Sequence, residues 1–291
     1  MGCCKSKPTT GATIVKPPID NAPLIQTLTL NYRFDTQPDA GVWTTGLVVT
    51  EKNQIVLCFR NQFKILIFDA EGEYIKSCET ANRPFNVAVV PNSSQLLVTL
   101  PGNKSLQCVD TMNWKAGNEL KTRGYCWGIF VKADKIFVGG DDEIYVMDLE
   151  GNNLKTIRVP GNCVRYLCVG TKEDKNIYFT SQNNVVHCIS MEGADVFTHT
   201  SPFLVAPAGI AVANHNVYVA GFGSFALHKL EFKSGEIINS VALKKENGIK
   251  KPKALCFNRH LTRLYIANNG GKSIVIYNTR PGVYDPEQEV T

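Results

Sequence analysis

The chain has 291 residues, of which 44% are hydrophobic and 20% charged, a balance typical of a folded globular protein rather than a disordered one. No run approaches about 18 consecutive apolar residues, which excludes a membrane-spanning helix. The 31 basic and 26 acidic residues give a net charge of +5, which permits an anionic partner without requiring one. The ten cysteines form no CxxC pair and no Cys/His cluster, so we expect free thiols in a reducing compartment and no zinc site.

The N-terminus carries a lipidation pattern and lacks the apolar core of a secretory signal. The sequence MGCCKS places Gly2 and Ser6 where N-myristoylation requires them, and Cys3 and Cys4 are adjacent candidates for palmitoylation. One myristoyl chain binds membranes only weakly, so a second chain is needed for a stable anchor. We therefore expect residues 1–23 to be an acylated, flexible tether that holds the protein peripherally on the cytoplasmic leaflet of a membrane. The alternative is an unmodified terminus.

The rest of the chain repeats one pattern of short apolar strands. Residues 54–77, 135–157 and 176–199 align well, and looser copies end near Asp110, Glu231 and Asn278. Each unit contains four strands in about forty residues, a period typical of β-propeller blades. Three of the units share a turn that ends in glycine, at Gly72, Gly151 and Gly193. Glycine suits such turns because tight hairpins often need a positive φ.

Six units occupy residues 46–279, which predicts an all-β, six-bladed propeller of four-stranded antiparallel blades. The sixth unit lacks a fourth strand, and the alternating apolar segment 24–32 is otherwise unassigned. We expect 24–32 to supply that strand and to close the ring, which removes exposed sheet edges. The propeller would then span 24–280, followed by an acidic tail at 281–291. An open solenoid or a sandwich is the alternative.

The repeats resemble those of NHL proteins. KPKALCFNRHLTRLYIANNGGKSIVIYN and RPFNVAVVPNSSQLLVTLPGNKSLQCVD match the NHL pattern best. WD40 Gly-His and Trp-Asp dipeptides do not occur. The chain is thus similar to the C-terminal propeller of TRIM-NHL proteins, without their RING, B-box or coiled coil. This resemblance implies a recognition module for protein or RNA, and it carries over no ubiquitin-ligase activity.

Basic residues are the strongest candidates for a binding site. In a propeller, the turn between the second and third strands and the link to the next blade emerge on the same face. We expect a monomer that binds a protein partner through this face, with RNA as the alternative and anionic lipid as a further occupant. Asp141, Asp142 and Glu143 interrupt the basic arc. The GFGSF turn adds two aromatic candidates. The full set is Arg60, Arg83, Lys104, Lys121, Arg123, Phe222, Phe225, Lys244, Lys245, Lys250, Lys251, Lys253 and Lys272.

Catalytic or metal-binding patterns are weaker. The five histidines fall in different repeats, and no nucleophile elbow or phosphate-binding loop occurs. A second alternative is a calcium-dependent propeller lactonase or esterase, with Asp141, Asp142, Asn183 and Asn269 facing the channel, although such residues mostly cap turns. Trp43, Trp114 and Trp127 are too scattered in sequence to predict an aromatic cage. We therefore expect a non-enzymatic protein without a cofactor.

Overall fold

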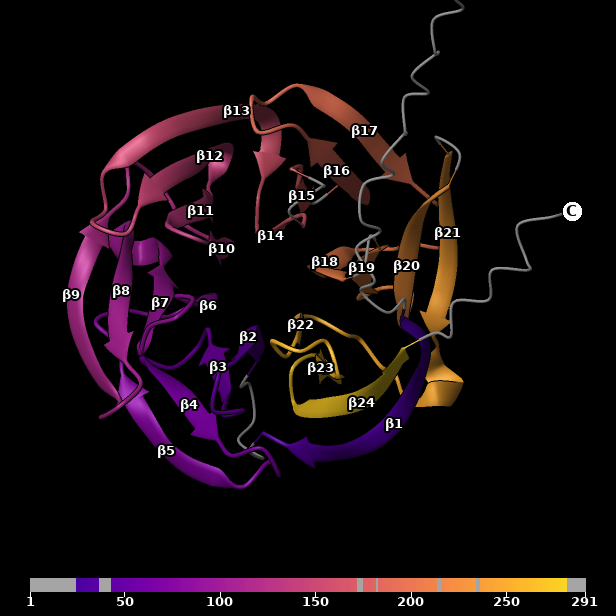
Figure 1. Ribbon diagram of the computed structural model, residues 1–291, viewed down its shortest axis with the longest axis horizontal. Coiled ribbons are helices and arrows are strands. Elements are labelled where there is room, and N and C mark those ends of the chain that lie inside the picture. The colour runs from indigo at the N-terminus through magenta and orange to yellow at the C-terminus, as the bar shows by residue number, and fades with distance from the viewer. Residues whose placement is uncertain are drawn as a thin grey trace, which may run out of the picture.

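The computed structural model describes residues 25–36, 43–171, 175–181, 183–213, 216–233 and 236–281. These residues form six four-stranded antiparallel sheets arranged in a ring around a central axis (Figure 1). The six-bladed propeller predicted from the repeats is confirmed. None of the described segments contains a helix that is long and apolar enough to cross a membrane. The lipidation candidates Gly2, Cys3 and Cys4, the tether 1–23 and nearly all of the acidic tail lie outside the described residues.

Each blade runs from an inner strand beside the axis to an outer strand at the rim. Blades one and two comprise β2 (Thr44–Val49), β3 (Ile55–Phe59), β4 (Lys64–Phe68), β5 (Tyr74–Glu79), β6 (Val87–Val89), β7 (Gln95–Leu100), β8 (Ser105–Asp110) and β9 (Lys115–Lys121). Blades three and four comprise β10 (Ile129–Lys132), β11 (Lys135–Gly139), β12 (Asp141–Asp148), β13 (Asn153–Cys163), β14 (Tyr166–Val169), β15 (Ile177–Thr180), β16 (Val185–Ile189) and β17 (Asp195–Thr200). Blades five and six comprise β18 (Pro207–Ala213), β19 (Asn216–Gly221), β20 (Ala226–Lys233), β21 (Glu236–Leu243), β22 (Leu255–Phe257), β23 (Arg263–Asn268), β24 (Ser273–Pro281) and β1 (Ile25–Asp35).

The second strand of each blade forms the core between neighbouring blades. All five residues of β3 are buried, whereas β5 at the rim is mostly exposed. Tyr178, Tyr218 and Tyr265 occupy equivalent positions in β15, β19 and β23 and are fully buried. These strands read as short continuous apolar runs because neighbouring blades cover both of their faces.

The shared glycine turns connect the third and fourth strands, as predicted. Gly72, Gly151 and Gly193 have φ angles of 90°, 94° and 91°. A polar side chain at the start of each turn accepts backbone hydrogen bonds: Asp69 Oδ1 from the amides of residues 71 and 73, and Ser190 Oγ from those of residues 192 and 194. These local bonds end the third strand and set the register of the fourth.

The N-terminal strand β1 closes the ring by pairing with β24 of blade six. The register joins Thr29 to Asn278 and Asp35 to Ser273, so the predicted closure is confirmed, although the strand extends beyond residue 32 to Asp35. β1 also reaches blade one, where the Phe34 ring lies 5.2 Å from the Phe68 ring. In Figure 1, β1 lies alongside β24 and ends beside blade one.

The antiparallel order of each blade places two sets of loops at the same end of the propeller. These are the turns between second and third strands and the links between blades, and we call this end the upper face. The six inner strands surround a channel with a cavity of about 480 Å³. Its lining extends from Asn86 and Tyr166 near the upper face to Glu51, Asn92 and Arg259 at the opposite end.

The contact between β1 and blade one gives a direct test of ring closure. A Cβ atom on Gly72 would lie 2.4 Å from the Phe34 ring, in addition to the strain of φ +90°. Gly161 has a similar φ of +76° with no atom near its Cβ position, so it provides a matched control. We expect Gly161→Ala to lower the free energy of unfolding by about 1 kcal/mol and Gly72→Ala by about 3 kcal/mol. Chemical denaturation measures both values.

The double variant Gly72→Ala/Phe34→Ala separates the two contributions. Because removal of the ring relieves the clash, the cost of Gly72→Ala in the Phe34→Ala background should fall to that of Gly161→Ala. Equal costs of Gly72→Ala in both backgrounds would show that β1 does not pack against blade one.

Candidate functional site

All of the basic residues that were predicted from the sequence as binding candidates lie on the upper face. Arg60, Lys104 and Lys272 lie in turns between second and third strands, and all three are exposed. Lys121 ends β9 beside Ser105, the first residue of β8. The remaining candidates lie in links between blades, with Arg83 after β5, Arg123 after β9, and Lys244, Lys245, Lys250, Lys251 and Lys253 between β21 and β22.

Four of the cations on this face lie over aromatic rings. The distances from the cationic group to the ring centroid are 4.9 Å for Lys253 over Trp43 and 5.4 Å for Lys104 over Tyr125. They are 5.7 Å for Arg83 over Phe63 and 5.9 Å for Arg165 over Trp127. Trp43, Phe63 and Tyr125 are each about half exposed, at 50%, 49% and 46%. The upper face therefore presents aromatic rings whose positions are fixed by neighbouring charges.

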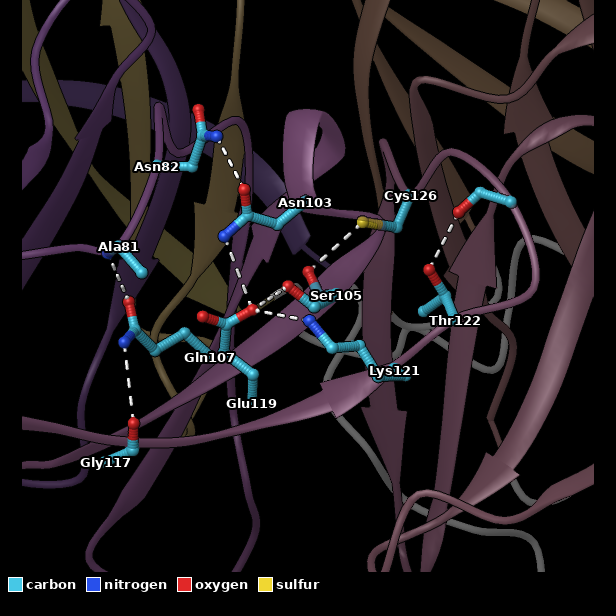
Figure 2. A network of polar contacts seen from close by, with 11 residues as sticks. Ala81, Asn82, Asn103, Ser105, Gln107, Gly117, Glu119, Lys121, Thr122 and Cys126 are labelled. Carbon is cyan, nitrogen blue, oxygen red and sulfur yellow. Dashed lines mark hydrogen bonds and ion pairs between the residues drawn. The ribbon is translucent and has the colours of Figure 1, made fainter.

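A hydrogen-bond network supports the part of this face formed by blade two (Figure 2). Glu119 Oε2 accepts from Ser105 Oγ at 2.5 Å and from Lys121 Nζ at 3.3 Å. Asn103 donates to the same oxygen and accepts from Asn82 Nδ2 at 2.6 Å. These bonds, that of Ser105 above all, hold the pKa of the Glu119 carboxyl below its usual value. Lys121 is thereby paired within the molecule, in an exposed ion pair of small energetic weight.

Three aromatic rings pack together where the channel meets the upper face. The Phe85 ring centroid lies 5.2 Å from that of Trp127 and 5.9 Å from that of Tyr166. Tyr125 stacks on Trp127 at 5.8 Å, and Trp127 Nε1 donates to Asp141 Oδ1 at 2.9 Å. Asp141 thus serves to orient this cluster, in addition to interrupting the basic arc.

Strand register identifies which residues surround the channel at this end. Leu47, Val87, Ile129, Leu167, Ile210 and Leu255 pair with equivalent positions of the second strands. The residues two positions earlier form one level at the upper end of the inner strands. We call them the mouth ring, and they are Thr45, Phe85, Trp127, Arg165, Ala208 and Lys253.

Lys253 is the predicted residue with the most perturbed environment. It is partly buried, and burial together with the charges of Arg60 and Arg165 lowers its pKa to about 8. Arg60 belongs to blade one and Arg165 to the link that enters blade four, so charges from opposite sides of the ring act on Lys253. No ion pair joins any of these three cations to a carboxylate of the described residues.

A second hollow on the upper face combines three predicted residues with one that the sequence did not indicate. Phe225, Lys244 and Lys245 line an open groove together with Phe203. The Phe203 side chain is 73% exposed and that of Phe225 is half-buried. Phe222 is partly buried and packs against the core, and its predicted role as a contact residue stays a prediction. The amide of the neighbouring Gly223 donates a hydrogen bond of 2.9 Å to the Val205 carbonyl. Gly223 packs so closely against Val205 that an added Cβ atom would lie 2.7 Å from Val205 Cγ1.

Two of the three tryptophans lie on the upper face. Trp43 and Trp127 precede inner strands of different blades, and each lies beside a cation. Trp114 is instead buried between blades, with 8% exposure. Tyr125, Arg165 and Tyr166 were not identified from the sequence, although superposition of the repeats places Arg165 and Trp127 at the same position as Lys253.

The residues considered for a metal site are spread over three blades, with Asp141 and Asp142 in blade three, Asn183 in blade four and Asn269 in blade six. Asp142 Oδ1 accepts from the Gly161 amide at 2.7 Å, and the Asn269 amide donates to the Lys250 carbonyl at 2.5 Å. Asn183 lies in an upper turn of blade four. Among the described residues, no group of three or more His, Cys, Asp or Glu side chains is arranged to hold a metal ion. The described cysteines are free thiols, and burial raises the pKa of Cys126 to about 11 and that of Cys256 to about 12.

Comparison with known proteins identifies the fold. No protein-family model and no curated protein matches the chain. The streptogramin B lyase structure is 16% identical with a TM-score of 0.63, covering 86% of this chain and 98% of that one. A catalytically inactive virginiamycin B lyase from Staphylococcus aureus with quinupristin is 14% identical with a TM-score of 0.63, covering 86% and 99%. The WD40 repeats of RRP9 are 10% identical with a TM-score of 0.67, covering 88% and 100%.

At these identities the likeness shows the fold alone. Because the similar structures include lyases as well as WD40 repeats, the shared fold does not by itself distinguish an enzyme from a binding scaffold. The chain is a six-bladed β-propeller with structural neighbours of the virginiamycin B lyase type.

Proposed function

We propose that this propeller is a recognition module that binds an acidic segment of a protein partner across its upper face. The observation that carries the proposal is the set of four cation–aromatic pairs on that one face. Tryptophan, tyrosine and arginine contribute most of the energy of protein interfaces, because they bury large rigid surfaces and bond to charged groups. Unpaired cations beside them favour a partner of opposite charge.

The pairing of the aromatic rings favours protein over RNA. Proteins that bind single-stranded nucleic acid stack bases on open ring faces. Here a cation occupies one face of Trp43, Tyr125 and Phe63, and Trp127 has Arg165 and Tyr125 as neighbours. Carboxylates can still reach the cations from the edges of the rings, and aliphatic stems can pack beside them. An acidic peptide therefore uses this surface without displacing the existing contacts.

A binding experiment distinguishes an acidic peptide from RNA as the ligand of the upper face. The probes are a fluorescein-labelled peptide of alternating Glu and Leu and an oligouridylate of equal charge, each titrated with the full chain while anisotropy is measured. We expect tighter binding of the peptide. Trp43→Ala combined with Tyr125→Ala should weaken peptide binding by about tenfold or more, because it removes two aromatic contacts together with the support of Lys253 and Lys104.

Lys115→Gln combined with Lys135→Gln is the matched control. Both lysines are exposed and lie on the face opposite to the upper face, beside turns that join first to second and third to fourth strands. This variant should lose charge without losing affinity beyond a small effect of net charge. Preferential binding of oligouridylate, or equal losses in both variants, would contradict the proposal.

Membrane tethering extends this proposal and depends on the pattern at Gly2, Cys3 and Cys4. We expect wild-type protein in the membrane fraction of a eukaryotic cell, and Gly2→Ala in the soluble fraction because the myristate acceptor is lost. Cys3→Ser/Cys4→Ser should bind weakly and reversibly, since one chain gives a binding constant on the order of 10⁴ M⁻¹. Wild-type protein that is wholly soluble would rule out the tether while leaving recognition by the upper face unaffected.

A further inference from the structure

Three cations converge where the channel opens on the upper face. Arg60 lies in the β3–β4 turn of blade one, Arg165 directly precedes β14 of blade four, and Lys253 precedes β22 of blade six. Arg165 and Lys253 belong to the mouth ring, and Arg60 is anchored there by a backbone hydrogen bond to Trp43. Trp127 and Trp43 hold the Arg165 and Lys253 head groups at 5.9 Å and 4.9 Å from their ring centroids. The Arg165 and Lys253 head groups are thus held in place, whereas Arg60 has an exposed side chain and is anchored at the mouth through its backbone.

These charges repel one another without a counter-ion. Arg60 and Arg165 both act on Lys253 and on Tyr166, and no carboxylate is among the groups that perturb either residue. Asp141 and Arg165 both act on Cys163, so one carboxylate lies nearby, but it accepts from the Trp127 indole at 2.9 Å and forms no ion pair with Arg165 among the described residues. Like charges held together in a partly buried place destabilise a protein unless an anion joins them.

Buried polar atoms without partners lie at the same level. Tyr166 is the first residue of β14, and its Oη is fully buried with no hydrogen-bond partner among the described residues. The same is true of Arg165 Nε and of Thr45 Oγ1, at the start of β2. Burial of a hydroxyl or guanidinium N–H without a partner costs about 1–3 kcal/mol. These unpaired groups are therefore unfavourable for the free protein, and an oxyanion bound at the mouth would give partners to the Tyr166 hydroxyl and the Arg165 guanidinium.

We propose that the upper mouth of the channel binds a single oxyanion through Arg60, Arg165, Lys253 and the hydroxyl of Tyr166. The planar guanidinium of Arg165 matches the two oxygens of a carboxylate or a phosphate, and Tyr166 donates a neutral hydrogen bond. That the oxyanion belongs to a protein partner rests on the proposed function. It is then a side-chain carboxylate, a C-terminal carboxylate or a phosphorylated residue of the acidic segment, anchored at the centre of the face.

The site is tested first with inorganic phosphate and acetate alone. In full-length protein labelled with ¹³C at the lysine ε-carbons, the Lys253 signal is assigned by its loss in Lys253→Met. Either anion, exchanged for chloride at constant ionic strength, should shift this signal saturably and raise the pKa of Lys253 from its value near 8. Exposed Lys115 on the opposite face should not respond. Equal responses of both lysines would show general screening and would overturn the site.

The pH dependence of phosphate and acetate binding follows from the charges at the mouth. Guanidinium groups do not lose their proton in proteins at ordinary pH, and burial raises the pKa of Tyr166 and of neighbouring Cys58 further above neutrality. Lys253 is the group in this cluster that loses its charge as the pH rises through about 8. Anion affinity should therefore fall over that range in the wild type and show no such fall in Lys253→Met, whose neutral side chain retains the contact with Trp43.

Single substitutions test whether Tyr166 and Arg165 bind the anion or only support the fold. Tyr166→Phe removes an unpaired hydroxyl, so it should leave thermal stability unchanged or higher while it weakens phosphate binding several-fold. Arg165→Gln should weaken it by about tenfold. Arg123→Gln, an exposed arginine of the same face, is the charge-matched control and should have little effect. Loss of stability in Tyr166→Phe with unaltered phosphate binding would contradict the proposal.

A set of peptide variants identifies which group supplies the oxyanion. The same set tests the oxyanion site and the proposed recognition function separately. The alternating Glu-Leu peptide is compared with its C-terminal amide, with a Gln-for-Glu version that keeps the free C-terminus, and with a Gln version carrying one phosphoserine. Whichever arm binds to the wild type should lose affinity in Arg165→Gln. If phosphate binds at Lys253 but no peptide does, the oxyanion site stands and the proposed function fails. If peptides bind equally well to wild type and Arg165→Gln, the proposed function stands and the partner is not anchored at the oxyanion site.

Discussion

The pairing of β1 with β24 is the constraint on which the rest of the structure depends. It joins the first described strand to the last blade, and Phe34 continues the contact into blade one. Only a closed ring brings the inner strands of all six blades around one channel. Arg60 and Arg165 therefore lie close enough to perturb Lys253, although they are far apart in sequence and in different blades. The chemistry of the upper face is a consequence of ring closure.

The upper face combines two kinds of contact that serve different purposes. Around its periphery, Arg83 and Lys104 are held over Phe63 and Tyr125, which gives a surface that is fixed before a partner arrives. At its centre, Arg165 and Lys253 lie over Trp127 and Trp43 in the same way, but here the cations also act on one another's surroundings and lie beside buried donors without partners. The proposed oxyanion would place its negative charge at this central position.

Sequence repetition was sufficient to predict the blades, the closing strand and the face that carries the basic residues. Each unit satisfies its strands locally, so its pattern is visible without knowledge of the others. The mouth of the channel is different because its members come from separate blades. Lys253 was identified as one of a run of lysines, whereas Arg165 and Tyr166 looked like ordinary residues at the start of a strand. Their importance depends on distances across the ring, and only superposition of the six repeats would have placed Arg165 level with Lys253.

A crystal structure of the full chain grown with selenate, with diffraction recorded at the selenium absorption edge, would locate the oxyanion site directly. Selenate is a tetrahedral oxyanion whose anomalous scattering marks its position independently of the surrounding density. We expect an anomalous peak at the upper mouth of the channel, within hydrogen-bond distance of Arg165, Lys253 and the Tyr166 hydroxyl. Selenate bound elsewhere on the basic face, with the mouth empty at the same concentration, would contradict it.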